Sequence, residues 1–577
     1  MRPKQRETTW KLDGLFLLLL ALSAAFLIPR MRIGANVLDE PFYFNTAHRL
    51  LQGDALLSEE WHLSQLSSVL MLPFLKLWLT RHTMEGVYLA FRYIYLAVKA
   101  VAAVGLYGLL RRRGQLPAMV AALILVLYAP FDLYQISYHS MGILAVTLHG
   151  ALIVRTWERP RFPAGVVSGL FLAVGVLCCP YLLGLWLAEL AGALLIRRKN
   201  GACLTLWLWI TAGAAALAVV VIAFLLSRAA PGEMLRNFAE MRKDPEHSLG
   251  MSRNVYYTLL RGVRYFSFQL VLYAVTLPLY ILWRGNKLPK VSHRTARCLY
   301  GASVGVGFAV SFVRRLTLIQ SSYNYIMIPA SLMGLMLAVW LLGEKNADGE
   351  CLPEIVWWGI GFLYALAICA SSNQQLHAFG NASTVSAVAT AFLAVRFYAP
   401  EDTGEGAPRL RRGILLSMAA LQLLGMAYRD KAHVFEYDKS PVSHTDGTAA
   451  FTALVQDGPL KGIRLTQAEY DQYNAIRREL DIFRSLPKDN FAMAVGNSWA
   501  YLDLDMPYGI YSGWSGEEIS VTTLSEAYYA LHPDKIPRYV YLLKDRFTQL
   551  DPLLERAEEN GYTVTEMELG VALIKAE

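Results

Sequence analysis

Long apolar blocks recur along the first three-quarters of this chain, and they constrain the fold more than any other feature. Most are about 17 to 25 residues long, near the length that a helix needs to cross a ~30 Å bilayer core. Only 17% of the 577 residues are charged, against about 25% in soluble proteins. We therefore expect a polytopic α-helical membrane protein with about thirteen spans. The blocks are 12–29, 86–110, 115–130, 140–156, 163–179, 181–196, 202–226, 264–283, 298–313, 324–342, 353–371, 381–398 and 412–428.

Basic residues between these blocks predict the orientation of the chain, because cytoplasmic loops of membrane proteins are rich in Lys and Arg. The triplets 111–113 and 197–199 are entirely basic, whereas the connections 131–139, 178–181 and 371–381 contain no Lys or Arg. This alternation predicts a cytoplasmic N-terminus and an extracytoplasmic C-terminus. The protein would be a multi-pass component of a bacterial-type inner membrane.

One further apolar segment, Leu63 to Leu79, does not fit this alternation. Pro73 and Lys76 interrupt it, and a span here would place the basic triplet 111–113 on the wrong side. We expect it to form an interfacial or re-entrant helix within a long outer loop at about 30–85. A second long outer loop is predicted at about 227–263, and long ordered loops are usually functional.

The chain is predicted to divide into a transmembrane domain, 1–428, and an extracytoplasmic α/β domain, 429–577. From Arg429 onward there are 15 Lys and Arg against 24 Asp and Glu, whereas the rest has 39 against 22. The basic excess thus belongs to the membrane loops and does not indicate nucleic-acid binding. The elements expected in the tail are a helix at 467–486, strands at 491–495 and 539–543, a helix at 550–560 and a strand pair within 563–575.

The first outer loop opens with adjacent carboxylates, Asp39 and Glu40, about ten residues beyond the first block. A carboxylate near the membrane surface can take a proton from an attacking hydroxyl or amine while a leaving group departs. The alternative is a solvated acidic turn that caps a helix starting at Pro41.

The same loop resembles a known family. The acidic pair is followed by Tyr43, the run Leu50-Leu51-Gln52-Gly53-Asp54, then Trp61 and Gln65 before an apolar helix that contains proline. This pattern resembles the first periplasmic loop of GT-C membrane glycosyltransferases, especially the protein O-mannosyltransferase and aminoarabinose-transferase group. The resemblance covers mainly residues 10–115. It implies a polyprenyl-phosphate sugar donor, with Asp39 as the catalytic base and Glu40 assisting.

The second outer loop carries a mixed cluster of charges: Lys243, Asp244, Glu246 and His247. Its cations could hold a phosphate, and its carboxylates could hold a divalent metal or an acceptor; no metal is required by the pattern. Enzymes of the group that the first loop resembles place substrate-binding residues in this loop. The alternative is an ordinary polar loop with a proline turn.

Arg314 and Arg315 lie at the predicted outer end of a span, against the positive-inside trend. Paired guanidinium groups can form bidentate bonds to the phosphate of a lipid donor, or they can anchor the helix to lipid headgroups. Tyr323 and Asn324 follow; they could line the same cavity or form part of an aromatic belt.

Helix 86–110 carries Arg92 on one face with Tyr88, Tyr95 and Lys99. Charged groups within a bilayer normally face the bundle interior or a wet cavity. Arg92 could therefore reach a donor phosphate, or it could form an internal pair with a carboxylate. Tyr138 and His139 begin a later span, where a histidine is either a substrate contact or a packed capping group.

Aromatic residues of the tail, Trp499, Trp514 and the segment Tyr508 to Tyr511, could form a platform for a sugar ring or belong to the core. The chain has no GxxxxGK[ST] phosphate loop, no HExxH and no dinucleotide-binding glycine pattern. ATP-driven transport within this chain is therefore not expected.

These observations predict a membrane glycosyltransferase. It would move a sugar from a polyprenyl-phosphate donor to an unknown glycan, lipid or protein acceptor outside the cytoplasm, by inverting general-base displacement. The substrate-binding candidates are Arg92, Tyr138, His139, Lys243, Asp244, Glu246, His247, Arg314, Arg315, Tyr323 and Asn324. The alternatives are a transporter or flippase of lipid-linked sugars and a non-catalytic membrane scaffold.

Overall fold

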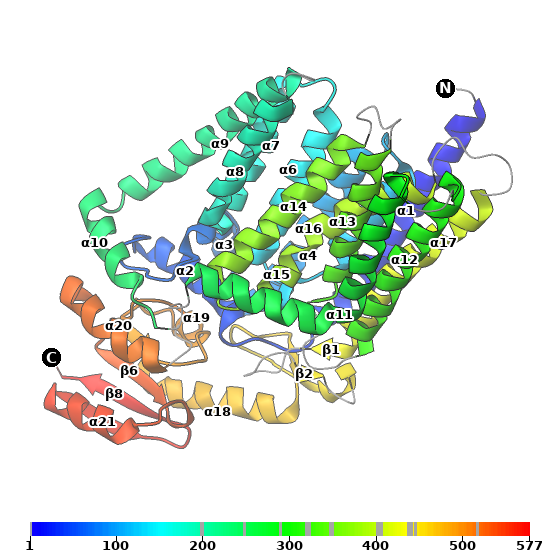
Figure 1. The fold of residues 1–577 in the computed structure, drawn as a ribbon. Coiled ribbons are helices and arrows are strands. Elements are labelled where there is room, and N and C mark those ends of the chain that lie inside the picture. Colours follow the sequence, from blue (N-terminus) through cyan, green and yellow to red (C-terminus); the bar gives the residue numbers. More distant parts are fainter. Residues whose placement is uncertain are drawn as a thin grey trace.

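The computed structural model shows a large helical bundle with a smaller α/β unit at one end (Figure 1). It describes residues 3–196, 201–245, 250–287, 291–317, 325–344, 351–399, 408–434, 442–443, 447–514 and 518–576. The N-terminus lies at the opposite end of the bundle from the α/β unit, which contains the C-terminus (Figure 1).

Each of the thirteen apolar blocks coincides with a helix, so the chain is a polytopic helical membrane protein. Within the described residues, six helices are long and apolar enough to cross a membrane, or seven if the bent pair α15 and α16 forms one span. The number thirteen therefore remains a prediction. The helices of the bundle are α1 (Pro3–Arg30), α4 (Val87–Leu110), α5 (Gln115–Leu127), α6 (Tyr138–Thr156), α7 (Phe162–Cys178), α8 (Leu183–Ile196), α9 (Ala202–Leu226), α11 (Met251–Arg284), α12 (His293–Thr317), α13 (Ile328–Gly343), α14 (Leu352–Ser371), α15 (Leu376–Ala382), α16 (Thr384–Tyr398) and α17 (Pro408–Ala432).

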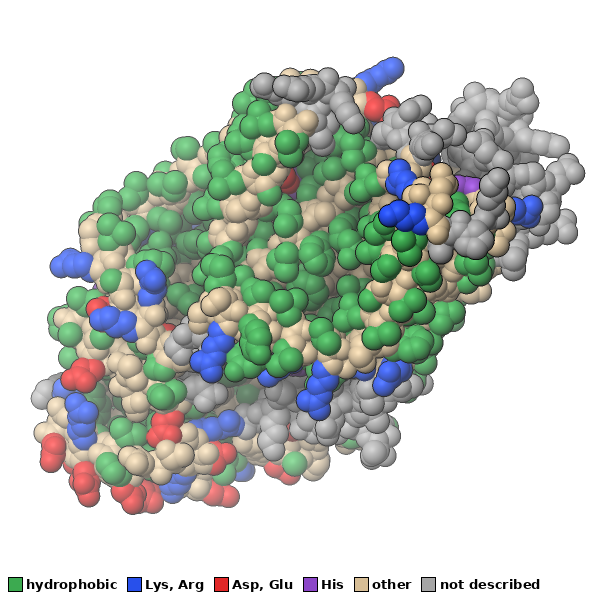
Figure 2. Space-filling model, viewed as in Figure 1, with side chains coloured by type: hydrophobic (Ala, Val, Ile, Leu, Met, Phe, Trp, Pro, Cys, Tyr) green, Lys and Arg blue, Asp and Glu red, His purple; other side chains and the backbone are tan. Residues whose placement is uncertain are grey.

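Glycine allows helices of the bundle to pack closely, as is common in membranes. A Cβ at Gly169 of α7 would lie 1.9 Å from the carbonyl oxygen of Ile210, and one at Gly213 of α9 would lie 2.0 Å from that of Val166. The outside of the bundle is apolar: Figure 2 shows a broad hydrophobic belt, with Lys and Arg along its edge near the α/β unit. Such a belt is what a lipid-facing surface requires.

Three short helices lie at the end of the bundle that carries the α/β unit (Figure 1): α2 (Asp39–Gln52), α3 (Ser68–Leu79) and α10 (Pro231–Met241). Helix α3 corresponds to the segment expected to be interfacial or re-entrant; its Leu77 side chain is 71% exposed. Helix α10 is amphipathic, since Leu235 is 70% exposed whereas Asn237 is buried. The depth of these helices in a bilayer stays a prediction.

The α/β unit contains a four-stranded sheet in the order β5-β6-β8-β7, in which β5 pairs parallel with β6 and the other pairs are antiparallel. The helices and strands expected in the tail are confirmed, whereas α19, α20 and the short strands β1 to β4 were not predicted. The elements are β1 (His433–Val434), β2 (Val442–Ser443), β3 (Ala453–Leu454), β4 (Arg464–Leu465), α18 (Gln467–Arg484), β5 (Phe491–Met493), α19 (Ala500–Leu504), α20 (Glu518–Leu531), β6 (Tyr539–Leu543), α21 (Leu550–Glu559), β7 (Tyr562–Glu566) and β8 (Gly570–Lys575).

Candidate functional site

Helix α2 begins at Asp39 because a side chain upstream caps it. The Asn36 Oδ1 accepts hydrogen bonds from the backbone N–H groups of Leu38 at 2.9 Å and Asp39 at 2.5 Å. These donors have no partner within the helix, so the cap satisfies them. The helix ends at Gly53, whose φ of 116° is a left-handed conformation that favours glycine. The sequence thus fixes both ends of α2 and places Asp39 in its first turn.

Asp39 is partly buried beside aromatic side chains from three parts of the chain. Its Oδ1 accepts a hydrogen bond from the Trp514 indole at 2.9 Å. Tyr43 and Tyr138, whose rings are 5.9 Å apart, lie close enough to interact electrostatically with the carboxylate. Burial raises the pKa of the Asp39 carboxyl above its usual 3.8, and the bonds from Trp514 and Asn36 offset only part of that rise. A carboxylate in this state is a stronger base than an exposed one.

Glu40, which was expected to assist Asp39, instead forms a buried ion pair with Arg92 of α4. The guanidinium donates to both carboxylate oxygens, at 2.6 and 2.7 Å, and to the carbonyl oxygens of Met31 and Gly34. Four of the five N–H donors of Arg92 are therefore occupied within the protein. The structure favours the internal pair for Arg92, and neither Arg92 nor Glu40 is available for substrate in this arrangement.

One face of α2 is bound to the α/β unit. Asn45 donates to the carbonyl oxygens of Ser498 at 2.9 Å and Gly513 at 3.2 Å. Three further side chains at helical spacing make polar contacts with the same unit: His48 with Tyr508 and Asp505, Arg49 with Ile510 and Tyr528, and Gln52 with Met506. The helix that begins with Asp39 is thus also one of the contacts between the bundle and the α/β unit.

Arg49 is the centre of a buried charge network at this contact. It bonds Asp54 at 2.8 Å and Glu60 at 3.0 Å, and Lys535 of the α/β unit bonds Asp54 at 2.6 Å. Burial alone would raise the pKa of Asp54, but the charges of Arg49 and Lys535 outweigh it and lower that pKa. Asp54 therefore stays ionised, and the network keeps the α/β unit against the first loop.

Arg315, at the end of α12, is a buried cation in an aromatic setting. Its guanidinium lies 5.3 Å from the ring centroid of Tyr265 and 5.5 Å from that of Phe266. Among the described residues it meets no carboxylate, and its Nε has no hydrogen-bond partner. Arg314 beside it is exposed. A buried guanidinium without a counter-charge can receive an anion.

Contacts connect the Asp39 region to the Arg315 region. The His139 ring packs 4.0 Å from that of Tyr138 and 4.5 Å from that of Phe131. The Phe131 N–H donates to Asn381 on α15 at 3.1 Å, and on the same helix His377 bonds Tyr325 at 3.0 Å. Tyr325 in turn interacts with Arg315. Tyr138 and His139 therefore belong to a chain of contacts that joins the two charged groups. Tyr323 and Asn324 lie outside the described residues.

Of the four candidates in the second loop, the structure describes Lys243 and Asp244. Lys243 is exposed and bonds Glu240 at 2.7 Å on its own segment, whereas Asp244 accepts a hydrogen bond from Ser520 of α20 at 2.6 Å. Glu246 and His247 lie outside the described residues. Across the described ranges, no group of three or more His, Cys, Asp and Glu side chains could hold a metal ion.

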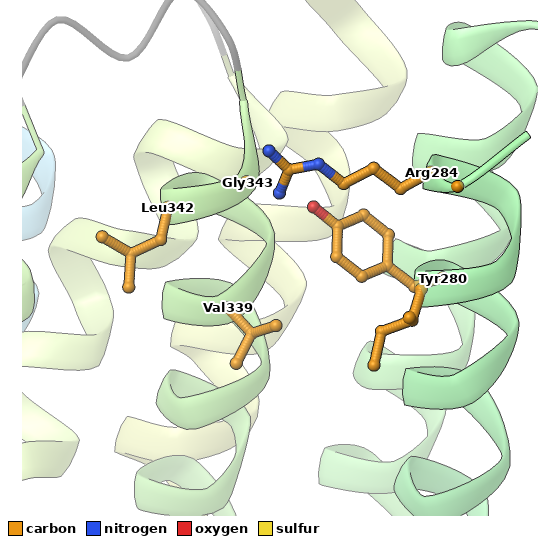
Figure 3. A pocket seen from close by; sticks show the side chains of 7 residues that line it. Tyr280, Arg284, Val339, Leu342 and Gly343 are labelled. Atoms are coloured by element: carbon orange, nitrogen blue, oxygen red, sulfur yellow. The ribbon is translucent and has the colours of Figure 1, made fainter.

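A pocket of about 510 Å³ lies elsewhere, between the last turns of α11 and α13. In Figure 3 the side chains of Tyr280 and Arg284 both point from α11 toward Gly343. None of the residues predicted to form the site lines it. The Asp39 region is therefore the better candidate, because it gathers a base candidate, aromatic side chains and a route to a buried cation.

Sequence reasoning did not identify three participants: Trp514 as a partner of Asp39, Asn36 as its cap, and His377 near Arg315. The capping signal was present locally, because Asn three residues ahead of an acidic pair is a recognisable helix start. The contact of Trp514 had no local signal, because 475 positions separate it from Asp39.

No protein-family model and no curated protein matches the chain. Several solved structures resemble its fold, among them the following two. The archaeal oligosaccharyltransferase AglB from Archaeoglobus fulgidus, in complex with an inhibitory peptide and a dolichol-phosphate, is 11% identical with a TM-score of 0.45, covering 92% of this chain and 69% of its own. ArnT from Cupriavidus metallidurans, bound to undecaprenyl phosphate, is 16% identical with a TM-score of 0.45, covering 97% and 98%. Both are GT-C membrane glycosyltransferases, the superfamily that the first loop resembles. At this level of likeness, the chemistry of the site rests on its own residues.

Proposed function

We propose that the protein is a membrane glycosyltransferase that moves a sugar from a polyprenyl-phosphate carrier to an acceptor outside the cytoplasm. The observation that carries the proposal is Asp39: a partly buried carboxylate, capped and hydrogen-bonded into a fixed position, at the end of an apolar bundle. An exposed acidic turn would have neither the burial nor the partner from the α/β unit.

The reaction would be a single displacement. The acceptor hydroxyl or amine attacks the anomeric carbon of the sugar while the bond from that carbon to the phosphate oxygen breaks. The acceptor proton moves to an Asp39 carboxylate oxygen, and polyprenyl phosphate leaves with the bonding electrons. Because attack and departure occur on opposite faces of one carbon, the anomeric configuration inverts. No nucleotide takes part, since the sugar arrives already activated on its lipid.

Arg315 would hold the anionic part of the donor. A phosphate brought beside it would supply the counter-charge that the described residues do not provide. Its aromatic neighbours Tyr265 and Phe266 would limit water around the ion pair, which strengthens it. The lipid tail would follow the apolar surface of the bundle, and Tyr138 and His139 would line the space between phosphate and base.

The decisive experiment incubates purified protein in detergent with a polyprenyl-phosphate sugar and follows release of the free lipid phosphate, with several lipid-soluble and water-soluble acceptors. We expect Asp39→Asn to lower the turnover rate by about 10²- to 10⁴-fold, the range for loss of a general base. Donor binding should persist, because the variant keeps the side chain's shape and the phosphate contacts lie elsewhere.

Glu85→Gln is the matched control, since Glu85 is an acidic residue of the same loop whose partner is Lys461 at the surface. It should leave turnover unchanged. Equal activity of wild type and Asp39→Asn would reject Asp39 as the base, and flux of intact lipid-linked sugar across vesicles without release of lipid phosphate would identify a transporter instead.

A further inference from the structure

The segment Ile510 to Trp514 of the α/β unit is held against the first loop along its backbone. The Ile510 carbonyl accepts a hydrogen bond from the Arg49 guanidinium at 3.1 Å. The Tyr511 carbonyl accepts one from the backbone N–H of Trp61 at 2.8 Å. The Gly513 carbonyl accepts from Asn45 at 3.2 Å, and its N–H donates to Glu60 at 3.3 Å. These four bonds fix the backbone up to the residue before Trp514.

Close packing reinforces these bonds. A Cβ on Gly513 would lie 2.8 Å from the Cβ of Asn45, so a larger residue there would push the segment off α2. Next to it, the Trp514 ring packs edge-on against His62 at 5.4 Å, and its backbone N–H donates to the Ser512 hydroxyl at 3.0 Å. The indole is thereby aimed at the start of α2, where its Nε1 donates to Asp39.

We propose that Trp514 is a positioning residue of the reaction, and that the α/β unit completes the catalytic site by supplying it. An indole N–H can only donate, so it holds Oδ1 of Asp39 without taking the proton that the base must accept. The same bond fixes which way the carboxylate faces. This inference rests on the proposed function for the role of Asp39, and on the described geometry for the contact itself.

The bond also affects when Asp39 is ionised. A donor to the charged form stabilises it, so Trp514 counteracts the rise in pKa that burial causes. Without the indole N–H, the pKa of Asp39 should rise further, and a higher pH would be needed before the base is available. A side chain that only filled space would not have this effect.

The first test compares pH profiles of kcat for wild type and Trp514→Phe, which keeps an aromatic ring but loses the N–H. The acid limb is the part of the profile in which kcat falls as the pH is lowered. We expect it to shift to higher pH by about one unit, as loss of a hydrogen bond to a charged group implies. At the optimum, kcat should fall by about tenfold or less. The matched control is Trp499→Phe, which removes an indole bond to Asn497 in the core of the α/β unit and should leave the limb in place.

The second test does not require turnover. The difference in tryptophan fluorescence between wild type and Trp514→Phe is recorded against pH in detergent. This fluorescence difference should change with pH as Asp39 ionises. The change should be absent when both proteins also carry Asp39→Asn, because the ionising neighbour is then absent. If the wild type transfers no sugar but this change is present, the proposed function fails while the contact stands.

An acid limb that stays in place in Trp514→Phe, or a fluorescence change that persists when both proteins carry Asp39→Asn, would overturn the proposal. If Trp514→Phe does not fold, as judged by gel filtration, benzothienylalanine is incorporated at position 514 instead. That residue replaces the indole N–H with sulfur at almost unchanged size, and the same two outcomes then decide.

Discussion

The two long connections at the α/β end of the bundle, about 30–85 and about 227–263, differ in whether their charged side chains are buried. In the first, Glu40, Arg49 and Glu60 are buried and ion-paired. In the second, Lys243 is exposed and forms an ion pair with Glu240, a neighbour on the same segment. Both connections are long and both contain a cluster of charges in the sequence. Length and charge therefore identify candidate loops. Burial of the charged side chains then distinguishes a candidate site from a solvated surface.

The difference follows from what each loop packs against. Helix α2 lies between the bundle and the α/β unit, so its charges must find partners there because leaving them unpaired is costly. Helix α10 presents only one face to its neighbours, where Asn237 accepts hydrogen bonds from Trp61 at 3.0 Å and His532 at 2.9 Å. Its other face, with Leu235 and Phe238, is exposed. Four experiments would test this contrast.

The largest effect is expected from Glu40→Gln. Removing one partner of a buried ion pair leaves Arg92 uncompensated, which costs about 3 to 5 kcal/mol. Thermal unfolding in detergent should show a marked loss of stability. Replacing both residues, as Glu40→Gln with Arg92→Met, should recover part of it. A single variant as stable as the wild type would show that the pair is not buried as described.

Arg315→Gln should weaken donor binding. The loss of a charge-assisted bond is worth about 1.5 to 3 kcal/mol, or roughly a tenfold to 150-fold rise in the dissociation constant. Binding of a polyprenyl-phosphate sugar, measured by competition with a labelled lipid, checks this. Arg314→Gln is the control on the exposed side and should change binding less. Equal effects of the two variants would place the phosphate elsewhere.

The pH dependence of turnover gives a third test. The Asp39 carboxyl acts as a base only when ionised, and its pKa is raised above 3.8 by burial. Activity should therefore be low near pH 4 and rise as the pH passes through that raised value. Glu85→Gln should retain the limb. A rate that is flat down to pH 4 would contradict the assignment of Asp39.

The smallest effect is expected from Lys243→Gln. An exposed ion pair contributes about 0 to 1 kcal/mol, so the melting temperature should hardly move and turnover should stay within about twofold. A loss of donor binding in this variant would show that the second loop closes over the site with substrate present, and the contrast between the two loops would then no longer hold.

Much of the fold could be predicted because apolar length and turn signals act locally. The blocks coincide with helices, and the tail strand Tyr539–Leu543 has the predicted bounds. Other parts depend on tertiary packing. The part of α11 before residue 264 was not included in the predicted block because Arg253 and Arg261 make it polar. It nevertheless forms one helix with the apolar part, bent at Phe266.

The site was predictable only where its residues are neighbours in sequence. Asp39 could be recognised from the loop pattern, and Arg92 from its position on a helix face. The pairing of Glu40 with Arg92, however, depends on how α2 packs against α4. Residue spacing within either segment does not predict that packing. The same holds for the second loop, where the sequence cannot show that Lys243 is exposed and paired with Glu240.

The bond between Trp514 and Asp39 joins residues 475 positions apart, and this separation has a consequence for the timing of biosynthesis. At a synthesis rate of about 5 to 20 residues per second, the indole is made roughly 25 to 95 seconds after the carboxylate. During that interval the bundle can insert and fold, but the proposed base lacks the group that we infer orients it. A nascent or truncated chain would therefore stay inert until the last unit has folded.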